Sequence, residues 1–501
     1  MGFQVIPQVP QCDQFIDGKF VPSMSGEYIP LISPESGQAV AQIANSTAQD
    51  VELAVQAAQR AFKESPWRSS IPYRVARMRT LAAKIRQNMS TLVEVESRIT
   101  GRPIREMRAQ LRRLPEWYDY FASVAETLED TMPPFGPGYL NFVRREPLGV
   151  VGLLTPFNHP LLILAKKLAP ALAAGNAAVI KPSELAPLTV NLLAGLIQES
   201  GIPDGIVNVV HGLGAIAGKA LAEHKALGKV DLTGGTATGR VVAACAGSNL
   251  IRVAAELGGK ASVVVFDDAD FMTAVNGAVF AGYIATGQTC VQGARVIVSE
   301  AMYDRFLEAF VAKVKKLRVG RPSDPETDIG PLISERHRKR VMECIKAGVR
   351  EGATLAYGST PLPSEGCYVS PTVLSDVTNN MTVAQEEIFG PVVCVMKYKS
   401  EEDAIAIANG TQFGLGMSVW TNDLRRAYRV AEQLEAGVVW INDHHRIHPA
   451  SPWGGYKDSG IGRENGIESY KDYTQVKSII VKTASDQFDW FDGSGAEKRY
   501  S

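Results

Sequence analysis

The chain lacks an excess of charge of either sign. Lys and Arg number 52 against 53 Asp and Glu, which leaves a net charge of −1 over 501 residues. Proteins that bind nucleic acid or an anionic membrane concentrate positive charge on one face. The balance therefore predicts neither a nucleic acid nor a membrane as partner.

Long apolar runs are also missing. No segment approaches the ~18 consecutive apolar residues that a membrane-spanning helix needs. The first residues, MGFQVIPQVPQCDQF, contain no basic stretch followed by an apolar one, which is the pattern of a secretory leader. We expect a soluble protein in the cytoplasm.

Cysteine is scarce, and no two cysteines form a CxxC pair. The sequence contains six: Cys12, Cys245, Cys290, Cys344, Cys367 and Cys394. Small secreted scaffolds and zinc knuckles need denser, closely spaced cysteines. The spacing therefore predicts no disulfide framework, no metal site and a reducing compartment.

Apolar residues, by contrast, make up 45% of the chain, against 21% charged residues. This composition is typical of a globular protein. At roughly 150 residues per domain, the length predicts two or three domains, each with its own core. No internal repeat is evident, which argues against a solenoid or a propeller.

Two helical segments stand out before residue 115. Thr47 and Asp50 predict a capped helix start, and apolar residues then recur every three or four positions. These positions are Val51, Ala54, Val55, Ala58 and Phe62. Further on, arginines repeat at helical spacing, and we interpret them as a solvated helix face. They are Arg98, Arg102, Arg105, Arg108, Arg112 and Arg113.

Short apolar strands alternate with helical segments after Pro147. A first set covers 149–154, 177–180, 206–210 and 229–232, and a second set covers 262–266, 295–298, 392–396 and 437–442. Buried parallel strands have this continuous apolar character. The fold class predicted is α/β, with two doubly wound α/β lobes and a cleft between them.

Residues suited to a nucleotide follow several of these strands. Lys181 and Glu184, in KPSE, follow a strand at the edge where α/β sheets bind ligands. A carboxylate there can accept both ribose hydroxyls and repels a 2′-phosphate. The glycine loops HGLGAIAGKA and TGGTATGR also lie between a strand and a helix. Their amides could face a pyrophosphate, or the glycines could simply make tight turns.

Cys290 in GQTC is the candidate nucleophile. A lone cysteine is commonly an inert, buried small side chain. A thiolate, however, attacks carbonyl carbon readily. The backbone amide of Cys290 and the side-chain amide of Asn158 are suitable donors for an oxyanion, and Glu256 lies upstream.

These segments resemble the NAD(P)-dependent aldehyde dehydrogenases. The resemblance extends from about Phe15 to about Val481 and consists of motifs in a fixed order: TPFNHP, LAPALAAGN, KPSE, TGGTATG, ELGGK, GQTC, EEIFGPV and WGGYKDSGIGRENG. The positions of Glu256 and Glu387 relative to Cys290 also agree with the family. A set of motifs in order is far more specific than any one of them.

The resemblance implies an oxidation of an aldehyde to the acid with NAD. Cys290 would form a thiohemiacetal whose oxyanion is held by Asn158 and the Cys290 amide, and Glu256 would activate the water that hydrolyses the thioester. Lys167 and Glu464 match positions associated with a proton relay, or they form a structural ion pair. Two alternatives remain, transfer of the acyl group to coenzyme A and a protein that has lost catalysis.

The resemblance also implies a set of cofactor residues. These are Thr155, Phe157, Lys181, Ser183, Glu184, Gly214, Thr233, Gly235, Thr236, Leu257, Glu387 and Phe389. Lys181 and Glu184 would bind the adenosine ribose, Glu387 the nicotinamide ribose, and Phe389 would contact the nicotinamide region. Glu184 favours NAD over NADP. Gly235 stands where many relatives carry serine, which removes one hydrogen bond to phosphate.

By the same resemblance, the substrate pocket comprises His159, Ile163, Lys166, Ile284, Val291, His445, Ile447 and Trp453. Only Trp453 could contribute to an aromatic cage, so an aldehyde of the choline type is disfavoured. Lys166, His445 and Arg446 could receive the carboxylate of a semialdehyde. Alternatively, these groups point outward and the apolar residues enclose an aliphatic or aromatic aldehyde. We favour the second arrangement, because basic residues at a rim usually extend into solvent.

Domain boundaries and assembly follow from the same comparison. The predicted division is an NAD-binding domain (1–130 and 148–257), a catalytic domain (258–446, with a return segment 447–470), an oligomerisation β element (131–147 and 471–488) and a C-terminal tail (489–501). A protruding hairpin near Tyr139 to Arg145 would pair with a strand near Val476 to Val481 and so bridge subunits. An open edge of this kind favours a homodimer or a homotetramer.

Overall fold

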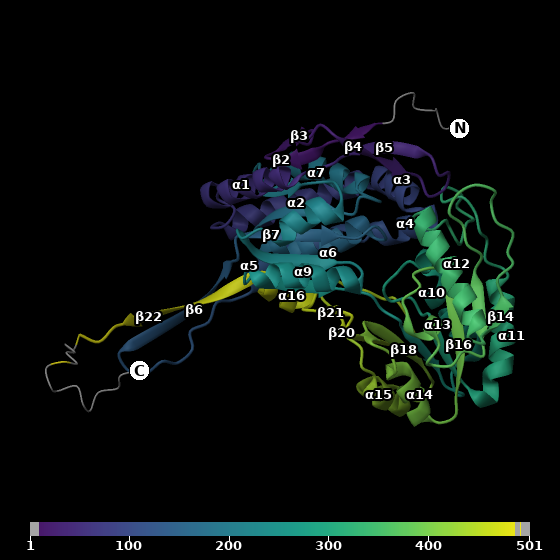
Figure 1. Ribbon diagram of the computed structural model, residues 1–501. Helices are drawn as coiled ribbons and strands as arrows, with labels where there is room; N and C mark the ends of the chain where they lie inside the picture. The colour runs from purple at the N-terminus through teal and green to yellow at the C-terminus, as the bar shows by residue number, and fades with distance from the viewer. Residues whose placement is uncertain (1–9, 486–490, 492–501) are drawn as a thin grey trace.

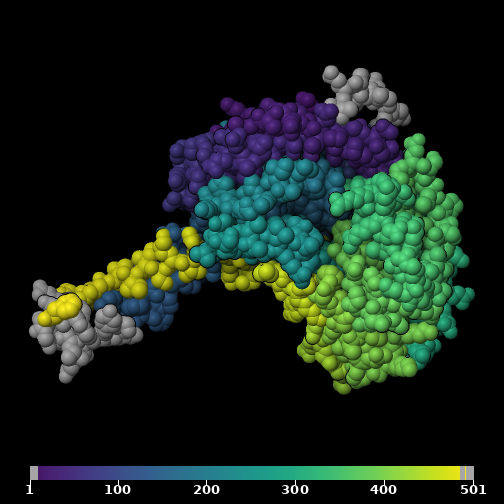
Figure 2. Space-filling model, viewed as in Figure 1, coloured from purple at the N-terminus to yellow at the C-terminus, as the bar shows by residue number. Residues whose placement is uncertain are grey.

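The computed structural model describes residues 10–485 and residue 491, so the predicted tail lies almost wholly outside the described residues. Two large sheets form the centres of two lobes that lie side by side (Figure 1, Figure 2). Both sheets are mostly parallel and carry helices on both faces. The predicted α/β class with two doubly wound lobes is confirmed.

The first lobe is built on an eight-stranded sheet. Its order is β21 (Gly460–Ile461), β11 (Arg252–Glu256), β10 (Leu227–Thr233), β7 (Val150–Thr155), β8 (Ala177–Pro182), β9 (Val207–Val209), β2 (Gln14–Ile16) and β3 (Lys19–Val21). The central strands, from β11 to β9, are parallel. The apolar runs of β7, β8, β9 and β10 correspond to the first set of predicted strands, whereas β11 was not predicted.

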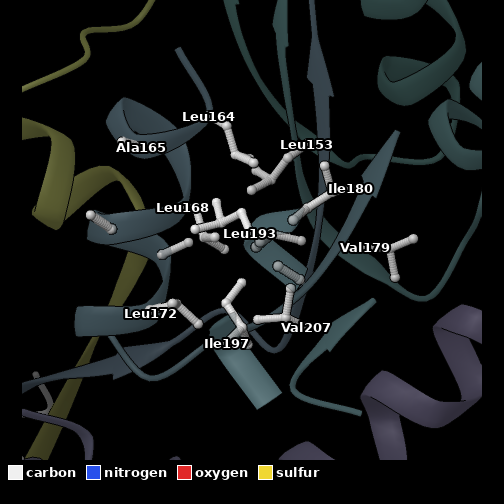
Figure 3. Packing of buried hydrophobic residues seen from close by; sticks show 14 of the residues in the cluster. Leu153, Leu164, Ala165, Leu168, Leu172, Val179, Ile180, Leu193, Ile197 and Val207 are labelled. Carbon is white, nitrogen blue, oxygen red and sulfur yellow. The ribbon is translucent and has the colours of Figure 1, made fainter. Parts of the chain in front are cut away.

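Helices of the first lobe cover this sheet. They are α1 (Ala48–Glu64), α2 (Ile71–Gln87), α3 (Met89–Thr100), α4 (Ile104–Leu111), α5 (Pro115–Thr127), α6 (Pro160–Ala173), α7 (Leu188–Glu199), α8 (Lys219–Ala222), α9 (Thr236–Ser248) and α16 (Gly466–Asp472). Leu168 of α6 and Leu193 of α7 pack on Ile180 and Val207 of the strands (Figure 3). Each buried aliphatic side chain contributes about 1.5–3 kcal/mol.

The two helical predictions before residue 115 have different outcomes. The start of α1 is confirmed, because Thr47 and Asp50 form a reciprocal capping box. The solvated arginine face is wrong for Arg102, which is only 3% exposed. Arg102 lies between α3 and α4 and forms a buried ion pair with Glu106 in the first turn of α4, so a nearby carboxylate compensates its burial.

The second lobe is built on a seven-stranded sheet. Its order is β14 (Thr354–Tyr357), β15 (Thr372–Ser375), β16 (Val392–Tyr398), β13 (Arg295–Ser299), β12 (Ser262–Val265), β18 (Gly416–Trp420) and β19 (Val438–Ile441). The covering helices are α10 (Phe271–Tyr283), α11 (Tyr303–Val314), α12 (Glu335–Arg350), α13 (Thr382–Gln385), α14 (Glu401–Asn409) and α15 (Leu424–Gln433). The second set of predicted strands is therefore also present.

Smaller sheets complete the fold. Strands β1 (Gln11–Cys12), β5 (Ala39–Ala44) and β4 (Tyr28–Ile32) form one, and β17 (Phe413–Gly414) pairs with β20 (Tyr456–Lys457). A two-stranded ribbon of β6 (Tyr139–Pro147) and β22 (Thr474–Lys482) extends away from both lobes (Figure 1). The predicted pairing of these two segments is present within the chain. No helix of the described part is long and apolar enough for a bilayer.

Candidate active site

The first sheet places its ligand-binding edge between β7 and β10. From β7 the chain proceeds to β8 and β9 on one side, then returns to add β10 and β11 on the other. At such a reversal the loops after the two central strands separate and leave a crevice at their carboxyl ends. The loop that holds Asn158 follows β7, and the loop that holds Gly235 follows β10.

Polar groups at this edge lack partners among the described residues. The hydroxyls of Thr155, at the end of β7, and Thr233, at the end of β10, are buried without a hydrogen bond. Gly235 precedes α9 as its N-cap, and no atom lies within 4 Å of the position that a Cβ would take. Leu257 packs against Gly239 of α9 and supports the helix from behind. Thr236 begins the helix and donates to the carbonyl of Asp458, at 3.3 Å.

KPSE lies at the end of β8, where Lys181 Nζ is 3.1 Å from Glu184 Oε2. Burial lowers the pKa of Lys181, and Glu184 partly offsets this. The turn that begins at Gly214 is adjacent, since Gly218 lies against the Lys181 chain. Ser183 accepts from the backbone amide of Leu185, at 3.3 Å.

Glu387 and Phe389 contact two different loops of the site. Glu387 Oε1 accepts from the amide of Gly259 at 3.0 Å. Gly259 in turn lies so close to the Cys290 carbonyl that a Cβ would be 2.1 Å from its oxygen. Burial raises the pKa of Glu387 to about 7, although the hydrogen bond from Gly259 acts to lower it. Phe389 forms an edge-to-face pair with Phe157, at 5.8 Å between ring centroids.

Cys290 is partly buried behind a strained turn. Ala285 and Thr286 precede it, each with a φ of 56°. This left-handed conformation is energetically unfavourable, especially for a β-branched residue such as Thr. Burial raises the pKa of Cys290 to about 12, with further increases from Glu387 and Glu256. The thiol is therefore protonated near neutral pH, and a base must remove its proton before it can attack.

Asn158 is held beside the same turn. Its side-chain Nδ2 donates to the carbonyl of Gln288 at 2.8 Å, and its Oδ1 has no partner among the described residues. Arg102 donates to the Asn158 carbonyl at 3.4 Å. An amide carries two N–H donors, so the second N–H of Asn158 remains available for a ligand.

A buried chain of charges lies behind Glu256. Lys166 Nζ is 2.8 Å from one oxygen of Glu464, and Lys167 Nζ is 2.7 Å from the other. Lys167 also contacts Asp231, which lies 3.4 Å from Lys229. Glu256 itself has an oxygen without a partner among the described residues. Burial and the negative charge of Glu464 raise the pKa of Glu256 well above its usual value.

Most of the predicted pocket residues lie close to Cys290 or to the loop of Asn158. Val291 and Trp453 form one buried cluster, against which Cys290 and Ile447 pack. The rings of His159 and His445 lie 6.2 Å apart. Ile163 is buried in α6, and Ile284 begins the turn that leads to Cys290.

The prediction that the basic groups point outward is wrong for Lys166. Its ammonium is buried, 4.3 Å from the ring centroid of Trp453, because Glu464 supplies a counter-charge in the interior. Burial lowers the pKa of His445 to about 3, so its ring is neutral. Arg446 does extend outward and pairs with Asp443 at 3.0 Å.

Several residues of the site were not predicted from the sequence. Glu106 accepts from the amide of Ala285 at 3.1 Å and so ties α4 to the turn before the nucleophile. Trp440 and Leu415 complete the apolar cluster at Cys290. The spacing of four residues between Arg102 and Glu106 was the available signal for the ion pair.

Known proteins resemble this chain over nearly its whole length. The model of the aldehyde dehydrogenase family matches residues 20–479. An aldehyde dehydrogenase of Emericella nidulans is 40% identical over 467 residues, 93% of this chain and 94% of that protein. The chain therefore belongs to the aldehyde dehydrogenase family, as its motifs predicted, and is an aldehyde dehydrogenase.

Solved structures agree with this assignment. Betaine aldehyde dehydrogenase of Staphylococcus aureus, in complex with NAD+, is 37% identical with a TM-score of 0.94, and the match covers 96% of each chain. PnpE of Pseudomonas sp. WBC-3 is 42% identical with a TM-score of 0.93, and the match covers 96% of this chain and 99% of PnpE.

Proposed function

We propose that the protein oxidises an uncharged aldehyde to its carboxylic acid with NAD, through a covalent thioester on Cys290. The observation that carries this proposal is that three residues lie near Cys290: one is hydrogen-bonded to its loop, one lies against its carbonyl, and the charge of the third raises the pKa of its thiol. Asn158 is hydrogen-bonded to the loop before Cys290, Gly259 lies against the Cys290 carbonyl, and Glu256 is buried with an unpartnered oxygen.

The residues divide the reaction between them. Cys290 loses its proton to a base and its sulfur adds to the carbonyl carbon, while the Asn158 amide and the Cys290 N–H stabilise the oxyanion. The bound dinucleotide supplies the acceptor for the hydride that leaves this carbon. Glu256 then takes a proton from water, the hydroxide attacks the thioester, and the acid departs as the Cys290 sulfur is released.

The electrostatics suit Glu256 as this base. A raised pKa brings a carboxyl group nearer to the working pH, where proton transfer in both directions is efficient. Lys166 and Lys167 counteract the burial and keep its pKa from rising further. We propose that Lys167 and Glu464 act through this field rather than by contact with substrate.

The cofactor edge fits a dinucleotide. The unpartnered hydroxyls of Thr155 and Thr233 and the open space above Gly235 offer hydrogen bonds and room for phosphates at the start of a helix. Glu184 stands beside Lys181 at the end of β8. A carboxylate at this position favours the ribose hydroxyls of NAD over the phosphate of NADP.

The buried charges argue for an uncharged substrate. Lys166, Lys167 and Lys229 are matched by Glu464, Asp231 and Asp472. His445 is neutral and Arg446 is solvated. A substrate carboxylate would therefore find no surplus positive charge among these groups, and burying it there unpaired would be costly.

The test follows NADH formation with a panel of aldehydes, with and without coenzyme A. We expect NADH without coenzyme A, and a Cys290→Ala variant without activity. Strict dependence on coenzyme A would replace hydrolysis by acyl transfer. Failure to form NADH with any aldehyde of the panel would contradict the proposal.

We also propose a homodimer or homotetramer in the cytoplasm. Leu140, Phe142 and Ile480 on the ribbon of β6 and β22 are exposed, and such apolar residues on an open two-stranded ribbon call for a partner. The free thiol of Cys290 requires a reducing compartment. Light scattering at micromolar concentration tests the assembly, and a monomer mass would contradict it.

A further inference from the structure

His159 presents a buried hydrogen-bond donor that the reaction above does not use. The residue is 5% exposed and stands at the N-cap of α6, directly after Asn158. Its Nε2 has no hydrogen-bond partner among the described residues. A buried polar atom without a partner is costly, so its retention needs an explanation.

Arg102 decides which ring nitrogen carries the proton. Its guanidinium NH1 lies 2.5 Å from His159 Nδ1. The side-chain oxygen of Gln110, which can only accept, also lies 3.0 Å from Nδ1, but the same Arg102 nitrogen donates to that oxygen at 2.8 Å. Guanidinium nitrogens can only donate, and Arg102 is the nearer neighbour of Nδ1, so Nδ1 accepts from Arg102. Burial and the positive charge of Arg102 lower the pKa of His159 well below its usual value, and the ring is neutral. A neutral imidazole with an accepting Nδ1 has its hydrogen on Nε2.

The neighbours of this donor belong to the aldehyde site. The ring of His159 is 6.2 Å from that of His445, whose Nε2 contacts the hydroxyl of Thr289 at 3.0 Å. Thr289 immediately precedes Cys290, and Asn158 immediately precedes His159. The donor thus lies on the same loop as the oxyanion donor, and His445 lies between its ring and the residue that precedes the nucleophile.

We propose that His159 Nε2–H donates to a second oxygen of the substrate, such as a hydroxyl or an oxo group, in addition to the aldehyde. This inference rests on the proposed function. The matching of nearby ammonium groups by carboxylates disfavours a carboxylate in this role. The substrate class is therefore an uncharged, oxygen-bearing aldehyde.

Arg102 is the positioning residue for this contact. It holds His159 by Nδ1, pairs with Glu106 at 3.0 Å, and Glu106 holds the Ala285 amide. One buried ion pair thereby fixes both the ring and the turn before Cys290. Replacing Arg102 alone would leave Glu106 as an unpaired buried charge, so it is a poor first test.

The experiment compares kcat/KM for pairs of aldehydes that differ by one hydroxyl: benzaldehyde with its 2-, 3- and 4-hydroxy derivatives, and acetaldehyde with glycolaldehyde. The protein, His159→Phe and His159→Gln are assayed with NAD. Phe keeps the ring without a donor, and the Gln amide can place an N–H near the position of Nε2.

We expect at least one hydroxylated member to be preferred, and His159→Phe to reduce that preference about tenfold, as for one lost hydrogen bond. His159→Gln should restore most of it. Three results would overturn the inference: the ratio of kcat/KM between hydroxylated and plain aldehyde is unchanged in His159→Phe, the loss is not restored by Gln, or the unmodified protein has no preference for the hydroxyl. In each case NADH formation would leave the proposed function intact. If none of the aldehydes yields NADH, both the inference and the proposed function are overturned.

Discussion

Replacement of Lys166 by Met separates a structural role from a substrate-binding role for this ammonium. The side chain is buried, 2.8 Å from Glu464 Oε2 and 4.3 Å from the Trp453 ring centroid. Met fills similar volume without charge. The variant therefore removes one of the two ammonium groups on Glu464 and leaves Lys167 in place.

The expected loss of stability is modest. Breaking a buried ion pair costs about 3–5 kcal/mol, and the remaining partner Lys167 favours the lower figure, about 3 kcal/mol. At about 2.1 cal/mol/K per residue, a chain of 501 residues has an unfolding entropy of about 1 kcal/mol/K. The melting temperature should therefore fall by about 3 °C.

The same substitution should move the pH dependence of the reaction. Lys166 lowers the pKa of Glu256, which burial and Glu464 raise, and also that of Cys290. Without the ammonium both pKa values increase. The acid limb of kcat/KM should shift to higher pH, and the shift should be the same for every aldehyde.

The assay measures kcat/KM for succinic semialdehyde and benzaldehyde between pH 6 and 10, with calorimetry in parallel. Arg446→Met is the matched control, because this exposed ion pair with Asp443 contributes little. Equal losses for both substrates fit the structural role of Lys166. A selective loss for the semialdehyde with an unchanged melting temperature would refute the reasoning.

Three further outcomes follow from the site. Glu256→Gln should form about one NADH per active site in a rapid burst, and its steady-state rate should then be at least about 100-fold lower than that of the unmodified enzyme. If stopped-flow absorbance shows no burst, hydrolysis is not the blocked step. Alkylation of Cys290 by iodoacetamide, without cofactor, should still accelerate at pH 10, because burial raises its pKa to about 12; mass spectrometry showing a plateau below pH 9 would contradict this. Glu184→Ser should increase the NADP to NAD ratio of kcat/KM about tenfold by freeing Lys181 for a 2′-phosphate, and an unchanged ratio would count against the ribose role.

Much of the fold could be predicted because its central strands are apolar on both faces. Runs such as 149–154 and 262–266 have no alternation of polar and apolar residues, which is the pattern of parallel strands covered by helices. β11 was missed, because RVAAE carries Arg252 and ends in Glu256. The order of the strands depends on long-range pairing, which no local pattern contains.

The site was predictable where chemistry requires a residue type and less so where packing decides. Cys290, Asn158 and Glu256 follow from motifs, and the structure brings their elements to one edge. The direction of Lys166 depended on Glu464, which lies in a distant segment. Glu464 reaches it because its backbone pairs with that of Trp453, so only the folded chain could show that this lysine turns inward.

The burial of Lys166 changes the meaning of the chain's neutrality. The chain as a whole has 52 basic and 53 acidic residues, and the buried charges behind Glu256 are balanced in the same way. There Lys167, Asp231 and Lys229 form a series of ion pairs from Glu464 to Asp472 near the surface. When Glu256 loses or gains a proton, the charge around Cys290 changes by one unit against this matched set. Glu256 and Cys290 therefore influence each other's protonation, and Lys166, which lowers the pKa of both groups, sets the level about which they do so.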